Sequence, residues 1–215
     1  MRVFGLDIEK GTLDNIRSFV CDVSDESQVI AVIEKIKETT RTIDYLVNAA
    51  GMLTIGRPIE ISQTPVKQLD AIIRINTLSA FILTKHCYPL LKNHGGAAVV
   101  NVSSEQAYKP QRGFAPYAIS KAAINALTQS AAIEFLDDKI RVNAVAFGTV
   151  ETNILKSYIA GNEEIDRMFA NKQESVPLGV MQPEDAAKVI LFLLSDDSRY
   201  MTGEVIRVNG GNCLV

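Results

Sequence analysis

The sequence predicts an α/β fold, a parallel sheet covered by helices on both faces. Short, continuously apolar segments alternate with longer segments of helical periodicity along the chain. Strands buried on both faces give such apolar runs, and the alternation with helices is typical of parallel strands joined by crossovers. The chain has 215 residues and 47% hydrophobic content, enough for one buried core and few for two. We therefore expect one domain over residues 1–215.

The individual elements follow from the same periodicities. A helix over 27–39 has apolar residues on one face, and the aspartates among residues 22–25 can cap its start. The polar segment 154–174 has no strong periodicity, and we expect it to be mobile. The expected strands are 2–6, 16–21, 44–48, 97–104, 140–146 and 204–208, and the other expected helices are 65–91, a helix through Tyr117, and 184–194.

Composition excludes several classes of function. A net charge of −3 and the absence of basic runs argue against a nucleic-acid surface. No apolar run approaches the roughly 20 residues of a membrane span. The three cysteines are far apart in the sequence, which suits a reducing compartment, so we expect a cytoplasmic protein. His86 and His94 have no partners at ligand spacing, so we expect no metal site. The expected partner is a small soluble molecule.

Tyr117 and Lys121 are the first candidates for catalysis. They are four residues apart in an expected helix, so both lie on one face, and Ser104 stands thirteen positions upstream at the end of an apolar strand. A phenol has an ordinary pKa of about 10, and a fixed cation nearby brings it towards neutrality. The carboxyl ends of parallel strands are where ligands bind. Taken alone, the spacing also describes an ordinary solvated pair.

Several further motifs stand in order around this pair. Asn48-Ala49-Ala50-Gly51 follows an expected strand, Asn76 lies within an expected helix, and Asn101-Val102-Ser103-Ser104 ends a strand. Ile140 to Val145, followed by Gly148 to Thr152, and the closing Met201-Thr202-Gly203 complete the series. Together they resemble the short-chain dehydrogenase/reductase family over essentially the whole chain. This resemblance implies a Rossmann-like doubly wound parallel sheet.

The resemblance assigns a role to each catalytic candidate. Tyr117 would be the general acid and base, Lys121 would hold the nicotinamide ribose and lower the phenol pKa, and Ser104 would bind the substrate oxygen. Asn76 would hold a water that links Lys121 to solvent. Simpler alternatives remain. Asn76 could cap or kink its helix, and the Ser104 hydroxyl could simply form hydrogen bonds with backbone groups at the end of the strand.

The cofactor implied by the resemblance is NAD. Asp7 closes the first expected strand, where a carboxylate accepts hydrogen bonds from a ribose 2′-hydroxyl and repels a 2′-phosphate. Asp7 could instead be an ordinary aspartate at the start of a loop, and Asn48 a turn residue. The remaining expected cofactor contacts are Asp22, Val23, Asn48, Ala49, Gly51, Val150 and Thr152, with Tyr117 and Lys121.

One family motif is absent from the sequence. The family begins with a strand and a Thr-Gly-x-x-x-Gly-x-Gly turn that brings backbone N–H groups to the cofactor pyrophosphate, and nothing similar precedes residue 2. The sheet is therefore expected to lack its first βα unit, between segments 2–6 and 44–48. The chain could begin at an internal methionine, be a shortened homologue that pairs with a partner chain, or receive the strand otherwise. We expect weak cofactor binding by this chain alone.

The resemblance implies interconversion of a secondary alcohol and a ketone. Segments 3–23 and 47–56 are most similar to 2,3-dihydro-2,3-dihydroxybenzoate dehydrogenases of siderophore biosynthesis, which suggests a cyclic dihydrodiol. A 3-oxoacyl-carrier-protein-reductase-like enzyme is an alternative. So is a non-catalytic binding or scaffold homologue that has lost the cofactor loop. The family usually forms dimers or tetramers, so a homo-oligomer is expected, and segment 154–174 would be its substrate-covering lid.

Overall fold

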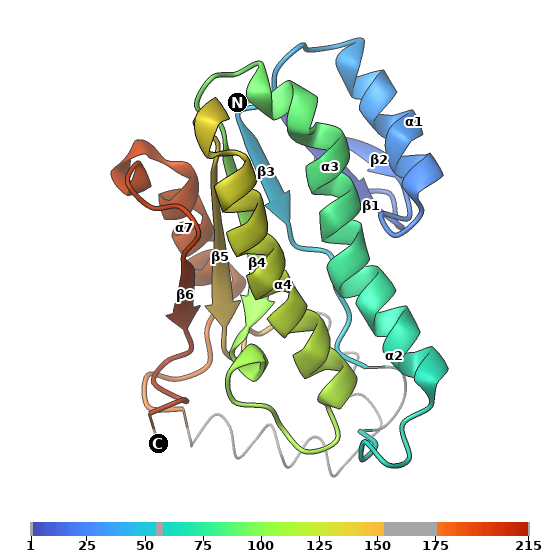
Figure 1. Ribbon diagram of the computed structural model, residues 1–215, viewed down its shortest axis with the longest axis vertical. Coiled ribbons are helices and arrows are strands. Elements are labelled where there is room, and N and C mark those ends of the chain that lie inside the picture. The colour runs from blue at the N-terminus through green and yellow to red at the C-terminus, as the bar shows by residue number, and fades with distance from the viewer. Residues whose placement is uncertain (1, 55–57, 153–175, 215) are drawn as a thin grey trace.

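The computed structural model describes residues 2–54, 58–152 and 176–214. Its strands form two parallel sheets, which confirms the predicted α/β class (Figure 1). The first sheet pairs β1 (Val3–Asp7) with β2 (Ile16–Val20). The second has the order β3-β4-β5-β6. Its strands are β3 (Tyr45–Asn48), β4 (Ala98–Ser104), β5 (Arg141–Phe147) and β6 (Val205–Val208).

The helices agree with the sequence predictions to within a few residues at each end. They are α1 (Glu26–Lys37), α2 (Val66–Ile73), α3 (Ser79–Lys92), α4 (Ala115–Glu134) and α7 (Pro183–Leu194). The Asp25 side chain caps α1 by accepting hydrogen bonds from the N–H groups of Ser27 and Gln28. The expected single helix over 65–91 is instead two α-helices joined by a π-helical turn, Arg74–Leu78.

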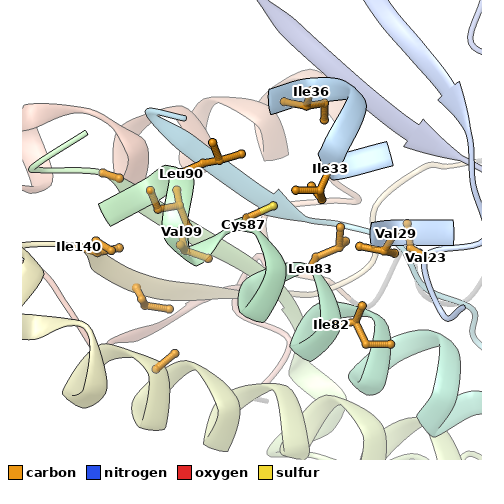
Figure 2. Packing of buried hydrophobic residues seen from close by; sticks show 14 of the residues in the cluster. Val23, Val29, Ile33, Ile36, Ile82, Leu83, Cys87, Leu90, Val99 and Ile140 are labelled. Carbon is orange, nitrogen blue, oxygen red and sulfur yellow. The ribbon is translucent and has the colours of Figure 1, made fainter. Parts of the chain in front are cut away.

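Both faces of the four-stranded sheet are covered by helices (Figure 1). Successive side chains of a strand point to opposite faces, so Val99 and Val142 pack with α1, α3 and α4, while Val100 and Val145 pack with α7. Figure 2 shows the first of these clusters, in which Ile33 of α1 lies near Leu83 and Cys87 of α3. The strands β4 and β5 are therefore shielded from solvent on both faces.

A cavity of about 970 Å³ separates the two sheets. Residues of β1 form one wall, residues of β3 form the other, and Leu83 and Cys87 of α3 contribute to the lining. Within the described part of the chain, β1 pairs only with β2 and β3 pairs only with β4. Each strand thus has one edge without a strand partner there. The cavity lies between β1 and β3, at the position expected for the first strand of the family sheet.

The segment 154–174, which was expected to be a mobile lid, lies outside the described residues. Among the described helices, none has both the length and the apolar character needed to cross a bilayer.

Candidate active site

The candidate site is a cavity of about 380 Å³ at the carboxyl ends of β4 and β5. Ser104 ends β4, Tyr117 and Lys121 come from the first turns of α4, and all three line the cavity. Most of the other walls are apolar. They include Met52, Leu53, Phe114, Phe147, Val150 and Ile190. The predicted catalytic side chains therefore converge in a largely apolar pocket, at the sheet edge where ligands bind in open α/β folds.

Helix α4 positions the central pair. Pro116 occupies the first helical turn, where its lack of an N–H costs no helical hydrogen bond. Tyr117 and Lys121 follow one turn apart, and the Lys121 Nζ lies 5.7 Å from the centroid of the Tyr117 ring. The phenol is hydrogen-bonded to Ser104. Lys121 is 4% exposed, and its Nζ donates to the Val102 carbonyl oxygen at 2.8 Å.

Burial shifts the pKa values of both groups. Burial raises the pKa of the Tyr117 phenol above its ordinary value, the hydrogen bond to Ser104 opposes this, and the charge of Glu105 adds to it. Burial lowers the pKa of Lys121 to about 8. The expectation that Lys121 lowers the pKa of the Tyr117 phenol is therefore wrong, because the pKa is raised. Desolvation of the phenol outweighs any effect of the Lys121 charge on the phenol pKa. The Lys121 ammonium is itself buried and donates to a backbone carbonyl.

Asn76 lies behind the cavity in the π-helical turn. It is 1% exposed; its Nδ2 donates to the Met52 carbonyl and the Ser120 hydroxyl, both at 2.9 Å, and its Oδ1 accepts from the Met52 N–H at 2.7 Å. A Cβ at Gly51 would meet Asn76 Oδ1 at 3.3 Å and Lys121 Nζ at 3.5 Å. Asn76 thus links the turn after β3 to α4 through hydrogen bonds. These hydrogen bonds are compatible with the predicted role of Asn76 in holding a water.

A buried polar chain supports the strands beneath the site. Asn48 Nδ2 donates to Asn101 Oδ1 at 2.8 Å and to Thr84 Oγ1 at 3.2 Å, and Asn101 Nδ2 donates to Thr128 Oγ1 at 2.9 Å. Sequence reasoning placed Asn48 near the cofactor but missed Asn101 and Thr128. An asparagine inside the apolar run of β4 was the available signal, because buried amides need partners.

The structure also separates the two adjacent serines. Ser103 Oγ donates to Asn125 Oδ1 at 2.6 Å and to the Lys121 carbonyl at 3.2 Å, so its hydroxyl is engaged with α4. Ser104 Oγ accepts from the Gln106 N–H at 3.2 Å and is bonded to Tyr117. The geometry therefore places Ser104, the serine chosen from the sequence, beside the phenol.

Most of the expected cofactor residues line one of the two cavities. Ala49, Gly51, Val150 and Thr152 line the 380 Å³ cavity, whereas Asp7, Val23 and again Ala49 line the 970 Å³ cavity. Asn48 and Asp22 line neither of the two. Asp22 instead accepts from the N–H and hydroxyl of Ser24, at 2.9 and 2.7 Å. Ala49 is thus the point where the two cavities meet.

Comparison with known proteins identifies the family. A family model described as enoyl-(acyl carrier protein) reductase matches residues 8–212. The chain belongs to the short-chain dehydrogenase/reductase family. Within this family it is 34% identical over 203 residues to a 3-oxoacyl-[acyl-carrier-protein] reductase of Thermotoga maritima, covering 94% of this chain and 79% of the relative. It is 32% identical over 200 residues to the 2,3-dihydro-2,3-dihydroxybenzoate dehydrogenase of Escherichia coli, covering 91% and 79%.

Solved structures agree with this membership of the short-chain dehydrogenase/reductase family. The ligand-free aldohexose dehydrogenase of Thermoplasma acidophilum superimposes with a TM-score of 0.91 at 25% identity, covering 100% of this chain and 85% of that one. A 7α-hydroxysteroid dehydrogenase in complex with NADH and a 7-oxo bile acid superimposes with a TM-score of 0.81 at 27% identity, covering 92% and 74%. The chain is therefore an oxidoreductase of a family that uses nicotinamide cofactors.

Proposed function

We propose that the chain is an NAD(H)-dependent enzyme that interconverts a secondary alcohol and a ketone. The observation that carries the proposal is the hydrogen-bonded pair of Ser104 and Tyr117, which lines an apolar cavity with Lys121 beside it. Two hydroxyls in one small pocket can bind the same substrate oxygen. The proposal assigns to Tyr117, Ser104 and Asn76 the roles that the sequence predicts, and to Lys121 the predicted role of holding the nicotinamide ribose.

The protein side of the reaction is a proton transfer at the substrate oxygen. In reduction, Tyr117 donates its phenolic proton to this oxygen while the Ser104 hydroxyl orients it; in oxidation, the phenolate takes the proton back. Because burial raises the pKa of the Tyr117 phenol, the acid form is stable near neutral pH. A bound nicotinamide cofactor supplies or accepts the hydride. The apolar walls keep water from the reacting atoms.

The described residues fit the two ends of a dinucleotide. At the nicotinamide end, Lys121 lies one helical turn from Tyr117. Gly51 has no side chain and so leaves space next to the Lys121 ammonium. At the adenosine end, Asp7 closes β1 on the wall of the second cavity, and its exposed carboxylate supports our assignment of NAD rather than NADP. Asn48 Oδ1, at the end of β3, is buried and has no hydrogen-bond partner among the described residues, so one acceptor there is unused.

The substrate proposal rests on likeness to two relatives. We propose a cyclic dihydrodiol, such as 2,3-dihydro-2,3-dihydroxybenzoate, because the chain is similar to a dehydrogenase of that name. The second candidate is a 3-oxoacyl thioester, because the similarity to a 3-oxoacyl-[acyl-carrier-protein] reductase is of the same size. In either case the proposed enzyme is a single-domain, cytoplasmic homodimer or homotetramer.

Activity with a substrate panel tests the proposal. Cyclic diols and 3-oxoacyl esters are assayed at saturating NAD or NADH, with the chain itself and with a version extended by a strand and a glycine-rich loop. Tyr117→Phe should lower kcat by on the order of a thousandfold in the active version, since it removes the proton donor. Tyr108→Phe is the matched control, because Tyr108 lies near Ser104 but does not line the cavity.

The outcomes separate enzyme from scaffold. Activity that survives Tyr117→Phe would remove Tyr117 from its proposed role. If both versions bind the cofactor yet leave every substrate unchanged, the non-catalytic binding protein becomes the better description.

A further inference from the structure

The lining of the active-site cavity includes an amide that the proposed mechanism does not use. Gln106 lies two residues after Ser104, lines the cavity and is 7% exposed. Its Oε1 is buried and has no hydrogen-bond partner in the described part of the chain. Buried polar atoms nearly always have partners, and an exception calls for an explanation. An unused acceptor in the wall of a cavity is explained by a ligand that brings the missing donor.

The local backbone places Gln106 beside the proposed catalytic serine. Residues Glu105–Ala107 form a 3₁₀ turn directly after β4, and the Gln106 N–H donates to Ser104 Oγ at 3.2 Å. Asn212 Nδ2 contacts both carboxylate oxygens of Glu105, at 2.9 and 2.8 Å, and so ties the turn to the C-terminal segment. The Gln106 side chain and the Ser104 hydroxyl are therefore presented to the same cavity by one anchored turn.

The amide of Gln106 is only weakly held within the protein. Its Nε2 donates to Gln111 Oε1 at 3.4 Å, a long distance for a hydrogen bond, and Gln111 also lines the cavity. Because this bond is weak, the amide can turn its oxygen towards a ligand at little cost. The other walls are largely apolar, so a ligand hydroxyl that is buried there also needs an acceptor.

The proposed chemistry leaves one kind of substrate group in need of this acceptor. The hydroxyls of Ser104 and Tyr117 bind the reacting oxygen, so a hydroxyl on the neighbouring carbon has no partner from that pair. A carbonyl oxygen such as Gln106 Oε1 accepts from an O–H group. A 3-oxoacyl thioester has no O–H group beside its reacting carbonyl, and it would leave the amide oxygen unpaired.

We propose that Gln106 accepts a hydrogen bond from a second substrate hydroxyl, on the carbon next to the reacting one, and so makes the cavity selective for vicinal diols. This proposal rests on the proposed alcohol–ketone chemistry and deepens it. It favours the cyclic dihydrodiol over the 3-oxoacyl thioester as the class of substrate.

Binding of ligands that differ in one hydroxyl tests this selectivity without turnover. Cyclohexane-1,2-diol, as its better-bound isomer, and cyclohexanol are titrated into the full chain and followed by ligand-observed NMR. The wild-type chain should bind the diol about tenfold more tightly, the size of one net hydrogen bond. The monomethyl ether of the diol keeps the second oxygen but has no O–H to donate to Gln106, so it should bind no better than cyclohexanol.

Three variants assign the preference to the amide. Gln106→Met keeps the length of the side chain without the amide, and should reduce the ratio to about threefold or less. Gln106→Glu keeps an acceptor oxygen, and should retain the preference for the diol. Gln129→Met is the matched control, because it makes the same substitution at an exposed position of α4, outside the lining of the cavity, and it should leave the ratio unchanged.

Two results with the wild-type chain would overturn the proposal even if every variant failed to fold. They are equal affinities for the diol and cyclohexanol, and equal affinities for the diol and its ether. An unchanged ratio in a folded Gln106→Met variant, or a lost preference in a folded Gln106→Glu variant, would also contradict it. Absence of hydride transfer with every substrate would contradict the proposed function but leave the binding ratios standing.

Discussion

The two sheets of this molecule differ in how completely their strands are enclosed. β4 pairs with β3 and β5, its faces are covered by helices on both sides, and Val99 and Val100 are fully buried. Among the described strands, β1 pairs only with β2, and its Val3 to Leu6 are only partly buried. The proposed catalytic residues lie on the enclosed side, and the proposed adenosine contacts Asp7 and Val23 lie at the cavity between the sheets.

This difference shows which part of the proposed site is enclosed by the described residues themselves. Ser104 and Lys121 are buried and Tyr117 is partly buried, so burial can shift the pKa values of the phenol and the ammonium and fix their hydrogen bonds. The cavity between β1 and β3 leaves two strand edges without a strand partner in the described residues. Such edges are available for pairing with another strand. Three experiments test this difference between the two sheets.

The largest effect is expected from filling the cavity between the sheets. An amino-terminal extension with one strand and a Thr-Gly-x-x-x-Gly-x-Gly loop should increase NADH affinity by on the order of a hundredfold or more, because backbone N–H groups would then bind the pyrophosphate. Titration of NADH fluorescence measures this change. The control extension carries valine in place of the loop glycines, which keeps the strand but closes the approach to the phosphates.

Tight, saturating NADH binding by the unextended chain would contradict this prediction. It would mean that the two ends of the dinucleotide site suffice without a pyrophosphate loop.

A smaller effect is expected on the enclosed side, from the buried charge of Lys121. Its pKa in the folded chain is about 8, below the ordinary 10.5, so between these values the unfolded chain binds more protons and stability rises with pH. Below pH 8 the buried charge of Lys121 destabilises the folded chain by about 3 kcal/mol. Lys121→Met removes it, and should be more stable than wild type by about this amount near neutral pH.

The stability difference between wild type and Lys121→Met should close as the pH rises through 8 towards 10.5. Urea unfolding of both chains at several pH values measures it. A difference that stays constant with pH would show that the Lys121 pKa is not depressed.

The smallest effect compares identical substitutions in the two sheets. Val142→Ala, at a fully buried position of β5, should cost about 2 kcal/mol because it leaves a cavity. Val3→Ala, at a partly exposed position of β1 beside the existing cavity, should cost about 0.5 kcal/mol. Urea unfolding of each variant gives both values. Equal costs would show that the two sheets are packed equally tightly.

Much of the fold was predictable because its signals are local. Apolar runs mark β4 and β5, and the α4 helix follows from the spacing of its small apolar residues. The π-helical turn at Arg74–Leu78 was not predictable, because the periodicities of α2 and α3 join smoothly across it. Asn76 within this turn bonds to Met52 and Ser120, and both are distant in the sequence.

The candidate site divides in the same way. The sequence indicated Tyr117, Lys121 and Ser104 through spacing within a helix and position at a strand end, and the structure brings all three to one cavity. The sequence did not reveal the Asn48, Asn101 and Thr128 chain, because its hydrogen bonds join residues 27 and 53 positions apart. The hydrogen bonds from Asn212 to the Glu105 carboxylate join residues 107 positions apart.

The sequence alone therefore determined the order of strands and helices, the family, and the identity of the catalytic candidates, since each depends on residues that are near one another in the chain. The environments of these residues depend on the tertiary structure and could not be predicted from the sequence. The tertiary structure set the direction in which the pKa values of Tyr117 and Lys121 move, placed the charge of Glu105 near the phenol, and left a cavity between β1 and β3. The physical reason is that burial, charge proximity and edge pairing depend on distant segments that meet only in the folded chain.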